Sequence, residues 1–380
     1  MQEDFHYYAT YCAAYMAGYT HSECMDICYS AQFVDLCSMT LLHKIKAPAE
    51  AATTQLQLEL MDTRTDIVGL QNITRIWSSF HFLPRDLNVT IDKRPKAYMN
   101  KYRLICGPDG ELVKKTAGLA KGKSLQAAGI AMHVIADTWA HAYFAGTPSL
   151  AINNTTDDFY EYITGEDGST ERKISFRHST STPDDPDKSI YSNSLFQRNE
   201  NNIMNLGHGR AGHLPDYSFI KYRYMPAWGE YRIVIKDNPS DYWNAFCQMI
   251  YAMKYLRGDT GDFRTGTYAY DIAAPYENRI KNILNKRQLK ASDDWKAFGE
   301  ELSGERIEDF DINRYQNEYI SAPDGSKHDT FLGKFTDAAI AHKGMVCHEI
   351  FSSGNKLTGF EKIIHSVKDK QNELFKNSLH

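Results

Sequence analysis

Apolar side chains recur at helical spacing along most of this chain. In residues 4–17, aromatic residues, Ala and Met follow that period until Gly18, and residues 50–78 place Leu and Ile on one side. Capping residues and prolines mark the ends of further segments. The pattern predicts helices over residues 4–17, 20–46, 50–78, 124–146, 193–205, 239–256 and 330–350, with surface helices between 277 and 321. We therefore expect a mostly α-helical protein.

Two polar stretches interrupt these helices. Residues 84–123 are rich in Pro, Gly, Lys and Asp, and a Leu-Ile-Cys run predicts a short hairpin strand in what is otherwise a connection. Residues 147–192 form a second polar stretch, long enough to be a functional lid or mobile. We expect a helical core over residues 1–258 that carries both insertions, and a helical extension over 259–380 packed on it.

The segment 124–146 is almost entirely apolar or small, which suits a helix buried on most sides. His133, Asp137 and His141 follow one another in it at intervals of four residues, so their side chains form one stripe. Buried polar groups need partners, so the three bond to each other, bind a metal or line a wet cleft. Imidazole and carboxylate are the ligands of zinc, iron and manganese, and we favour a metal.

A metal at this helix needs ligands from other segments, and four segments offer them. Three are apolar helices with His or Asp at the start, in the interior or at the end. The fourth is a loop whose three glycines let the backbone approach a small site closely. For His6 the alternative is a surface histidine, and for His81 a packed core histidine. The candidates are Asp4 and His6, Asp35, His81, and the loop residues His208, His213 and Asp216.

Composition narrows the class of protein. The 380 residues are 42% hydrophobic and 24% charged, which suits a globular chain with one large or two ordinary cores. A net charge of -5 gives no strong nucleic-acid signal. Met1 leads directly into Gln-Glu-Asp-Phe-His, without the pattern of a secretory signal, and the seven cysteines lack the spacing of metal knuckles. We expect a cytoplasmic protein with reduced thiols and no transmembrane segment.

The order of the candidate ligands resembles that in the zinc-dependent phospholipases C and the S1/P1-type nucleases. Those all-helical enzymes take ligands for three zinc ions from an N-terminal His, an Asp on the second helix, a His before an aromatic residue, a His-x-x-x-Asp helix with a further His, and a late His with an acid. Here the order reads His6, Asp35, His81-Phe82, His133-x-x-x-Asp137 with His141, and His208 or His213 with Asp216. The resemblance covers about residues 1–220. The whole chain also resembles a bacterial family with the same Asp-Phe-His start and glycine loop.

The first resemblance implies a phospholipase C/P1 nuclease-like helical bundle with long loops and a small β-hairpin insertion. It also implies a hydrolase of phosphodiester bonds that uses two or three zinc ions. Asp137 would bridge two ions. His81, His133 and Asp35 would complete one site, and His6 the next, with Asp4 in place of the N-terminal amine that ligates zinc in those enzymes. His141, His208 or His213, and Asp216 would hold a third ion.

The same resemblance implies catalytic roles for two residues. Asp35 would orient a metal-activated water for in-line attack on phosphorus, and Arg210 would hold a phosphate oxygen. The chain departs from the family where His141 follows Asp137 by four residues instead of six, and where the closing acid follows a Pro instead of lying on a helix. The third metal is therefore the least supported by sequence.

Other functions fit parts of the pattern. A His-Asp phosphohydrolase needs an adjacent pair, and the chain has only His328-Asp329, in a polar loop. A di-iron bundle needs two Glu-x-x-His motifs, and only Glu3-x-x-His6 is present. The non-enzymatic alternative is a helical binding or scaffold protein with a structural His/Asp network or a vestigial metal site. The substrate, a small-molecule or lipid phosphodiester, and the oligomeric state stay open.

Overall fold

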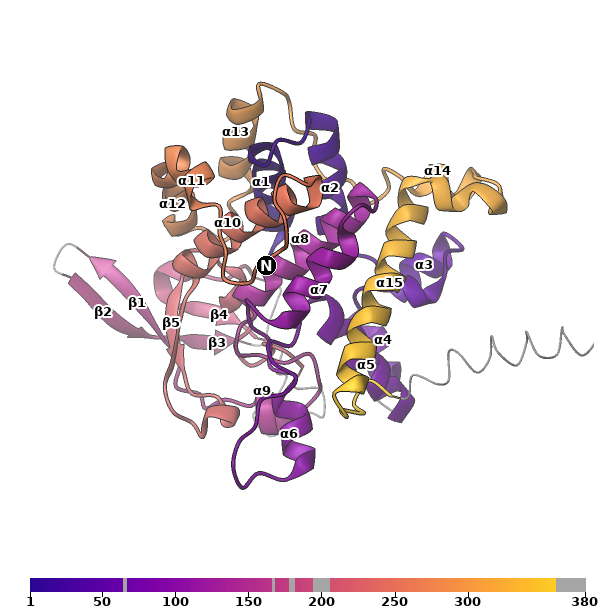
Figure 1. Cartoon of the computed structure of the whole chain (residues 1–380). Helices are drawn as coiled ribbons and strands as arrows, with labels where there is room; N and C mark the ends of the chain where they lie inside the picture. The colour runs from indigo at the N-terminus through magenta and orange to yellow at the C-terminus, as the bar shows by residue number, and fades with distance from the viewer. Residues whose placement is uncertain (64–66, 166–167, 178–181, 194–205, 360–380) are drawn as a thin grey trace, which may run out of the picture.

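Helix α8 (Leu125–Ala140) runs through the centre of the molecule and is buried along nearly all of its length (Figure 1). Five helices pack around it. They are α2 (His21–Phe33), α5 (Ile67–Phe80), α7 (Glu111–Ala120), α10 (Asn238–Arg257) and α15 (Phe331–Ser352). The computed structural model describes residues 1–63, 67–165, 168–177, 182–193 and 206–359. Over these residues the chain is mostly helical, as the sequence predicts.

The N-terminal helices form where the pattern places them but are shorter than predicted. The first is a π-helical turn, η1 (Asp4–Ala9), followed by α1 (Thr10–Met16), and it ends where Gly18 adopts a φ of +94°. Thr20 caps α2 through a reciprocal bond with Glu23. The predicted helix over 20–46 breaks after Phe33, because Thr53 donates its hydroxyl to the Val34 carbonyl at 2.6 Å. The remaining helices of this part are α3 (Met39–Lys44), η2 (Ala49–Ala51) and α4 (Gln57–Thr63).

The first insertion is not merely a connection, and this expectation was wrong. It contains α6 (Lys96–Tyr102) and α7, and α7 buries Leu112, Val113 and Ala117 in the main core. The predicted hairpin strand is absent from this described segment, where Ile105 and Cys106 form only isolated bridges. The backbone at Cys106 instead bonds to Tyr143 and Phe144 and draws the chain out of α8. The helix predicted over 124–146 therefore ends at Ala140.

Small sheets form after α8, beside the short helix α9 (Leu150–Asn153). An antiparallel sheet has the order β2-β1-β5-β6, and a parallel pair joins β3 to β4. Their inward aromatic residues make a second core with Phe82 and Phe144. The predicted hairpin insertion thus lies in the 147–192 stretch, and the helix predicted around 193–205 falls outside the described residues. The strands are β1 (Tyr160–Gly165), β2 (Gly168–Lys173), β3 (Ser175–Arg177), β4 (Ile190–Ser192), β5 (Lys221–Tyr224) and β6 (Val234–Asp237).

The C-terminal helices share the main core with the N-terminal ones. Trp295 of α13 packs against Phe5, and Phe335 of α15 packs against Phe33. The surface helices predicted between 277 and 321 are present, and the helix predicted over 330–350 is α15. The elements not yet named are α11 (Tyr270–Ala273), α12 (Glu277–Asn285), α13 (Ser292–Ser303), α14 (Gln316–Ser321) and the short turns η3 (Pro186–Lys188), η4 (Leu214–Asp216), η5 (Ala227–Gly229), η6 (Ala274–Tyr276) and η7 (Asp324–Asp329).

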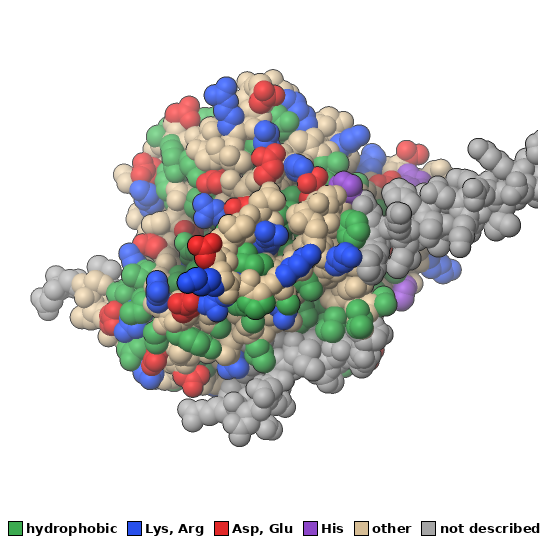
Figure 2. All heavy atoms as spheres, turned by 60° about the horizontal axis from the view of Figure 1, so that its bottom comes forward, with side chains coloured by type: hydrophobic (Ala, Val, Ile, Leu, Met, Phe, Trp, Pro, Cys, Tyr) green, Lys and Arg blue, Asp and Glu red, His purple; other side chains and the backbone are tan. Residues whose placement is uncertain are grey.

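The surface mixes both signs of charge with apolar side chains, as Figure 2 shows for one face. All seven cysteines are free thiols, and every one except Cys347 is buried. Among the described residues, the helices are all too short or too polar to cross a lipid bilayer.

Candidate metal centre

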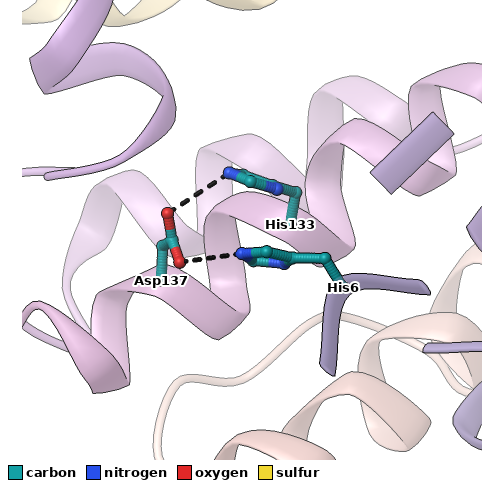
Figure 3. A group of neighbouring side chains, drawn as sticks. All are labelled: His6, His133 and Asp137. Carbon is teal, nitrogen blue, oxygen red and sulfur yellow. Dashed lines mark ion pairs between the residues drawn. The ribbon is translucent and has the colours of Figure 1, made fainter. Parts of the chain in front are cut away.

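Asp137 lies at the centre of a cluster of imidazoles, one turn after His133 on α8 (Figure 3). Its Oδ1 is 3.1 Å from His6 Nε2, and its Oδ2 is 3.2 Å from His133 Nε2 and 3.3 Å from His81 Nδ1. The rings of His6 and His133 stack with their centroids 3.8 Å apart. All four side chains are buried, so one carboxylate is shared by three imidazoles that are cut off from bulk water.

Three sets of side chains could each hold a metal ion. In each set, one ligand atom from every member lies within 4.8 Å of the others. Two sets share His133, and in the third His141 Nε2 is 3.2 Å from Asp216 Oδ1. The sets are His6 with His133 and Asp137, Asp35 with His81 and His133, and His141 with His208 and Asp216. The fold thus collects residues from five separate segments at one place.

Close packing of α2 on α8 positions the centre of the cluster. Gly129 makes this approach possible, because a Cβ at that position would lie 2.4 Å from the Ile27 carbonyl oxygen. One turn further along α8, His133 Nδ1 reaches the carbonyl of Ala31 at 2.9 Å. The break after α2 then brings Asp35 to the cluster, with its Oδ1 3.7 Å from His81 Nδ1.

Four of the histidines use one ring nitrogen on a main-chain carbonyl. Such a bond requires the nitrogen to carry its proton, so the other nitrogen of a neutral ring is a bare lone pair. This arrangement fixes the ring orientation and is typical of histidines that bind metal. The four bonds are His81 Nε2 to Thr53 O at 3.0 Å, His133 Nδ1 to Ala31 O at 2.9 Å, His141 Nδ1 to His81 O at 2.7 Å and His208 Nδ1 to Gly212 O at 2.6 Å.

The remaining nitrogens therefore face one another and the carboxylates as acceptors. His133 Nε2 is 3.3 Å from His81 Nδ1 and 3.2 Å from Asp137 Oδ2, three lone pairs with no proton assigned between them. His6 Nε2 lies 3.1 Å from Asp137 Oδ1, and Nδ1 of the same ring has no hydrogen-bond partner among the described residues. Acceptors held this close repel unless a cation lies among them. These residues fit a metal ion better than a network of hydrogen bonds.

The charges are those that a metal needs. Burial lowers the pKa of His6, His133 and His208 to about 4, so these rings are neutral at pH 7. For Asp137 and Asp216, burial acts to raise the pKa. The surrounding imidazoles and the Met1 amine outweigh it and hold both pKa values well below the usual range. Anionic carboxylates beside neutral imidazoles can bind a divalent cation without first releasing protons.

The metal-free protein should lose stability as the pH falls from 6.5 towards 4. Four buried histidines, His6, His133, His208 and His342, have a pKa of about 4 against an ordinary value of 6.5, so in this window the unfolded chain binds more protons than the folded one. Asp4, whose pKa burial raises to about 6, opposes this as a single group. We expect chelator-treated protein to lose about 3 kcal/mol of unfolding free energy between pH 6.5 and 5.5, measured by urea titration. A flat profile would contradict the neutral, buried state of these rings.

The other predicted residues do not belong to the three sets. Asp4 lies outside the three sets, and its Oδ2 accepts a bond from the Ala291 N–H at 2.9 Å. His213 Nδ1 is 3.2 Å from Asp216 Oδ2, but the ring is 56% exposed, and His208 is the histidine of the third set. Arg210 is half-buried, and its Nε has no hydrogen-bond partner in the described part of the chain. The His328 ring pairs with Asp337 on the surface.

Sequence reasoning missed the amino group of Met1. It donates to Asp137 Oδ1 at 2.8 Å and lies 3.3 Å from Asp216 Oδ1 and 3.4 Å from His141 Nε2. Burial acts to lower its pKa, but the charges of Asp137 and Asp216 outweigh this and raise the pKa to about 11. The Met1 amine thus occupies the position that we expected for Asp4. It lies between Asp137 of one set and Asp216 of another. The available signal was the resemblance itself, in which an N-terminal amine is a ligand.

Comparison with known proteins gives a family but no function. The sequence model of a family described as "Family of unknown function (DUF6765)" matches residues 1–350. No curated protein and no solved structure matches the chain.

Proposed function

The chain belongs to a family of unknown function, DUF6765, and we propose that it is a metal-dependent hydrolase of phosphodiester bonds. The observation that carries the proposal is the set of four histidines that each use one nitrogen on a main-chain carbonyl and turn the other towards shared carboxylates. Such a set binds two or three ions close together, and adjacent metal ions are typical of phosphoester hydrolysis. Imidazole and carboxylate ligands favour zinc.

Each proposed ion has its own residues. Asp35, His81 and His133 would hold the first, and His6 would hold the second together with the Met1 amine, once that amine has released a proton. Asp137 belongs to both, since its two oxygens face the two sides. His141, His208 and Asp216 hold the third. The fold that goes with this proposal is the phospholipase C/P1 nuclease-like helical bundle.

The solvent exposure of each residue in the cluster decides the role that we propose for it. Zinc bound here would make a water acidic enough to attack phosphorus and would stabilise the charge on the leaving oxygen. Asp35 is 28% exposed at the rim, while Asp137 and His133 are buried, so Asp35 is the carboxylate that can orient a water from solvent. Arg210, in the loop that carries His208, holds a phosphate oxygen in the proposed complex. The substrate is a small-molecule or lipid phosphodiester.

Metal content and turnover test this proposal together. Protein purified without a metal-affinity tag is analysed for bound metals and assayed with bis(p-nitrophenyl) phosphate, with p-nitrophenyl phosphate as the monoester control. We expect two or three zinc ions per chain, and diester hydrolysis that a chelator abolishes and zinc restores. A folded protein that stays metal-free in excess zinc would refute the metal centre. Bound zinc without hydrolysis of diesters, including lipid diesters, would instead support the vestigial site of a binding protein.

A further inference from the structure

Helices α7, α8 and α15 contact one another (Figure 1), and a cavity lies between them. Its volume is about 330 Å³, close to the lower end of the ~300–1,000 Å³ that ligand pockets occupy. Most of its wall is apolar and comes from all three helices. These side chains are Leu119, Ala120, Ala127, Ile130, Ala338 and Ala341.

The polar residues of the lining are Thr116, Lys123, Ser124, Lys334, Asp337 and His342. Lys123 and Lys334 are both exposed side chains of its lining, and neither forms an ion pair with a residue in the described part of the chain. Asp337, the acid beside them, is already paired with His328 at 2.7 Å. Thr116, on the wall, is 1% exposed, and its Oγ1 has no hydrogen-bond partner among the residues that the structure describes. The lining therefore offers two ammonium groups that form no ion pair among the described residues, and one hydroxyl, beside an apolar surface.

We propose that this cavity binds a small amphiphile with a hydrocarbon chain of about ten carbons and an anionic head group. The chain contacts the apolar walls, and the head group lies near Lys123 and Lys334. The length follows from the volume, since one water's share of liquid is about 30 Å³ and a methylene group is of similar size. The charge follows from the two unpaired ammonium groups.

Decanoate is the probe, and isothermal titration calorimetry on the full chain is the measurement. We expect one site per chain, at least tenfold weaker binding of hexanoate, and at least tenfold weaker binding of decanoate to K123E/K334E. Decanol should bind the wild type and the double variant alike, because it lacks the charge.

Two variants of α15 distinguish the loss of binding caused by filling the cavity from a general effect of adding a tryptophan to this helix. Ala341→Trp places an indole in the cavity from an exposed position, whereas Ile340→Trp changes the neighbouring residue, which is outside the lining. We expect the first to weaken decanoate binding at least tenfold and the second to leave it unchanged. Absence of decanoate binding to the wild type, or equal binding by both variants, would overturn the proposal. Metal content is measured on the same samples, and it bears on the hydrolase alone.

Discussion

Asp137→Asn should empty two of the three metal sites. The amide keeps the shape of the side chain but loses the charge that faces His6 on one side and His81 and His133 on the other. Removing the shared anion also leaves the Met1 ammonium without its nearest partner. We expect at most one zinc ion per chain and a loss of about 10³-fold or more in diester hydrolysis, equivalent to about 4 kcal/mol of transition-state stabilisation.

Two further variants make this result specific. Asp216→Asn should remove only the third ion, because Asp216 belongs to a single set. Asp109→Asn is the matched control: its carboxylate accepts bonds from Gln248, Gly266 and Tyr268, all outside the cluster. Its φ of +61° also suits Asn. Asp109→Asn should keep its metals even if it loses stability. Equal metal loss in the Asp109 and Asp137 variants would show that unfolding, and not a missing ligand, explains the result.

The helices could be predicted from sequence because their apolar periodicity is strong. The residues at which they end could not be predicted. Nothing in residues 34–38 breaks a helix by composition. The break comes from Thr53, which bonds to the carbonyl of Val34 from a distant part of the chain. The end of α8 likewise depends on backbone bonds between Cys106 and residues 143–144. Tertiary hydrogen bonds of this kind leave no local pattern in the sequence. The observed ends of these helices therefore differ from the predicted ends by several residues.

The sequence was enough to predict which residues belong to the candidate site. It was not enough to predict how they are arranged in space. His133 and Asp137 follow from helical spacing, because residues four apart on one helix face the same way. The choice between His208 and His213 depends on a loop in which Gly207 and Gly212 adopt positive φ and Gly212 accepts the His208 proton. Spacing cannot supply that conformation.

Asp4 shows a second limit of prediction from sequence: a residue close to the site along the chain need not belong to it. It lies next to the cluster in sequence, yet it bonds to Ala291 N–H, a partner nearly three hundred residues away. A sequence pattern suggests ligands only by the types of their side chains. The group found there is a main-chain amine, which every chain possesses and no residue type reveals.

His133 and His342 provide a matched pair that separates a metal ligand from a core histidine. Both rings are buried, burial lowers the pKa of both to about 4, and each bonds to a main-chain carbonyl at 2.9 Å. Only His133 also faces carboxylates. His133→Gln and His342→Gln should each lose about 1 kcal/mol from the broken carbonyl bond when metal is absent.

Zinc should then distinguish the two variants. A ligand that binds only the folded state at a thousand times its Kd adds about 4 kcal/mol of stability, which raises the Tm of a chain of this size by roughly 5 °C or more. We expect that rise in the wild type and in His342→Gln, measured by differential scanning calorimetry with and without zinc. In His133→Gln it should be largely lost, because His133 belongs to two of the three sets. An undiminished rise in His133→Gln would place the metal elsewhere and leave the stripe on α8 as a buried polar network.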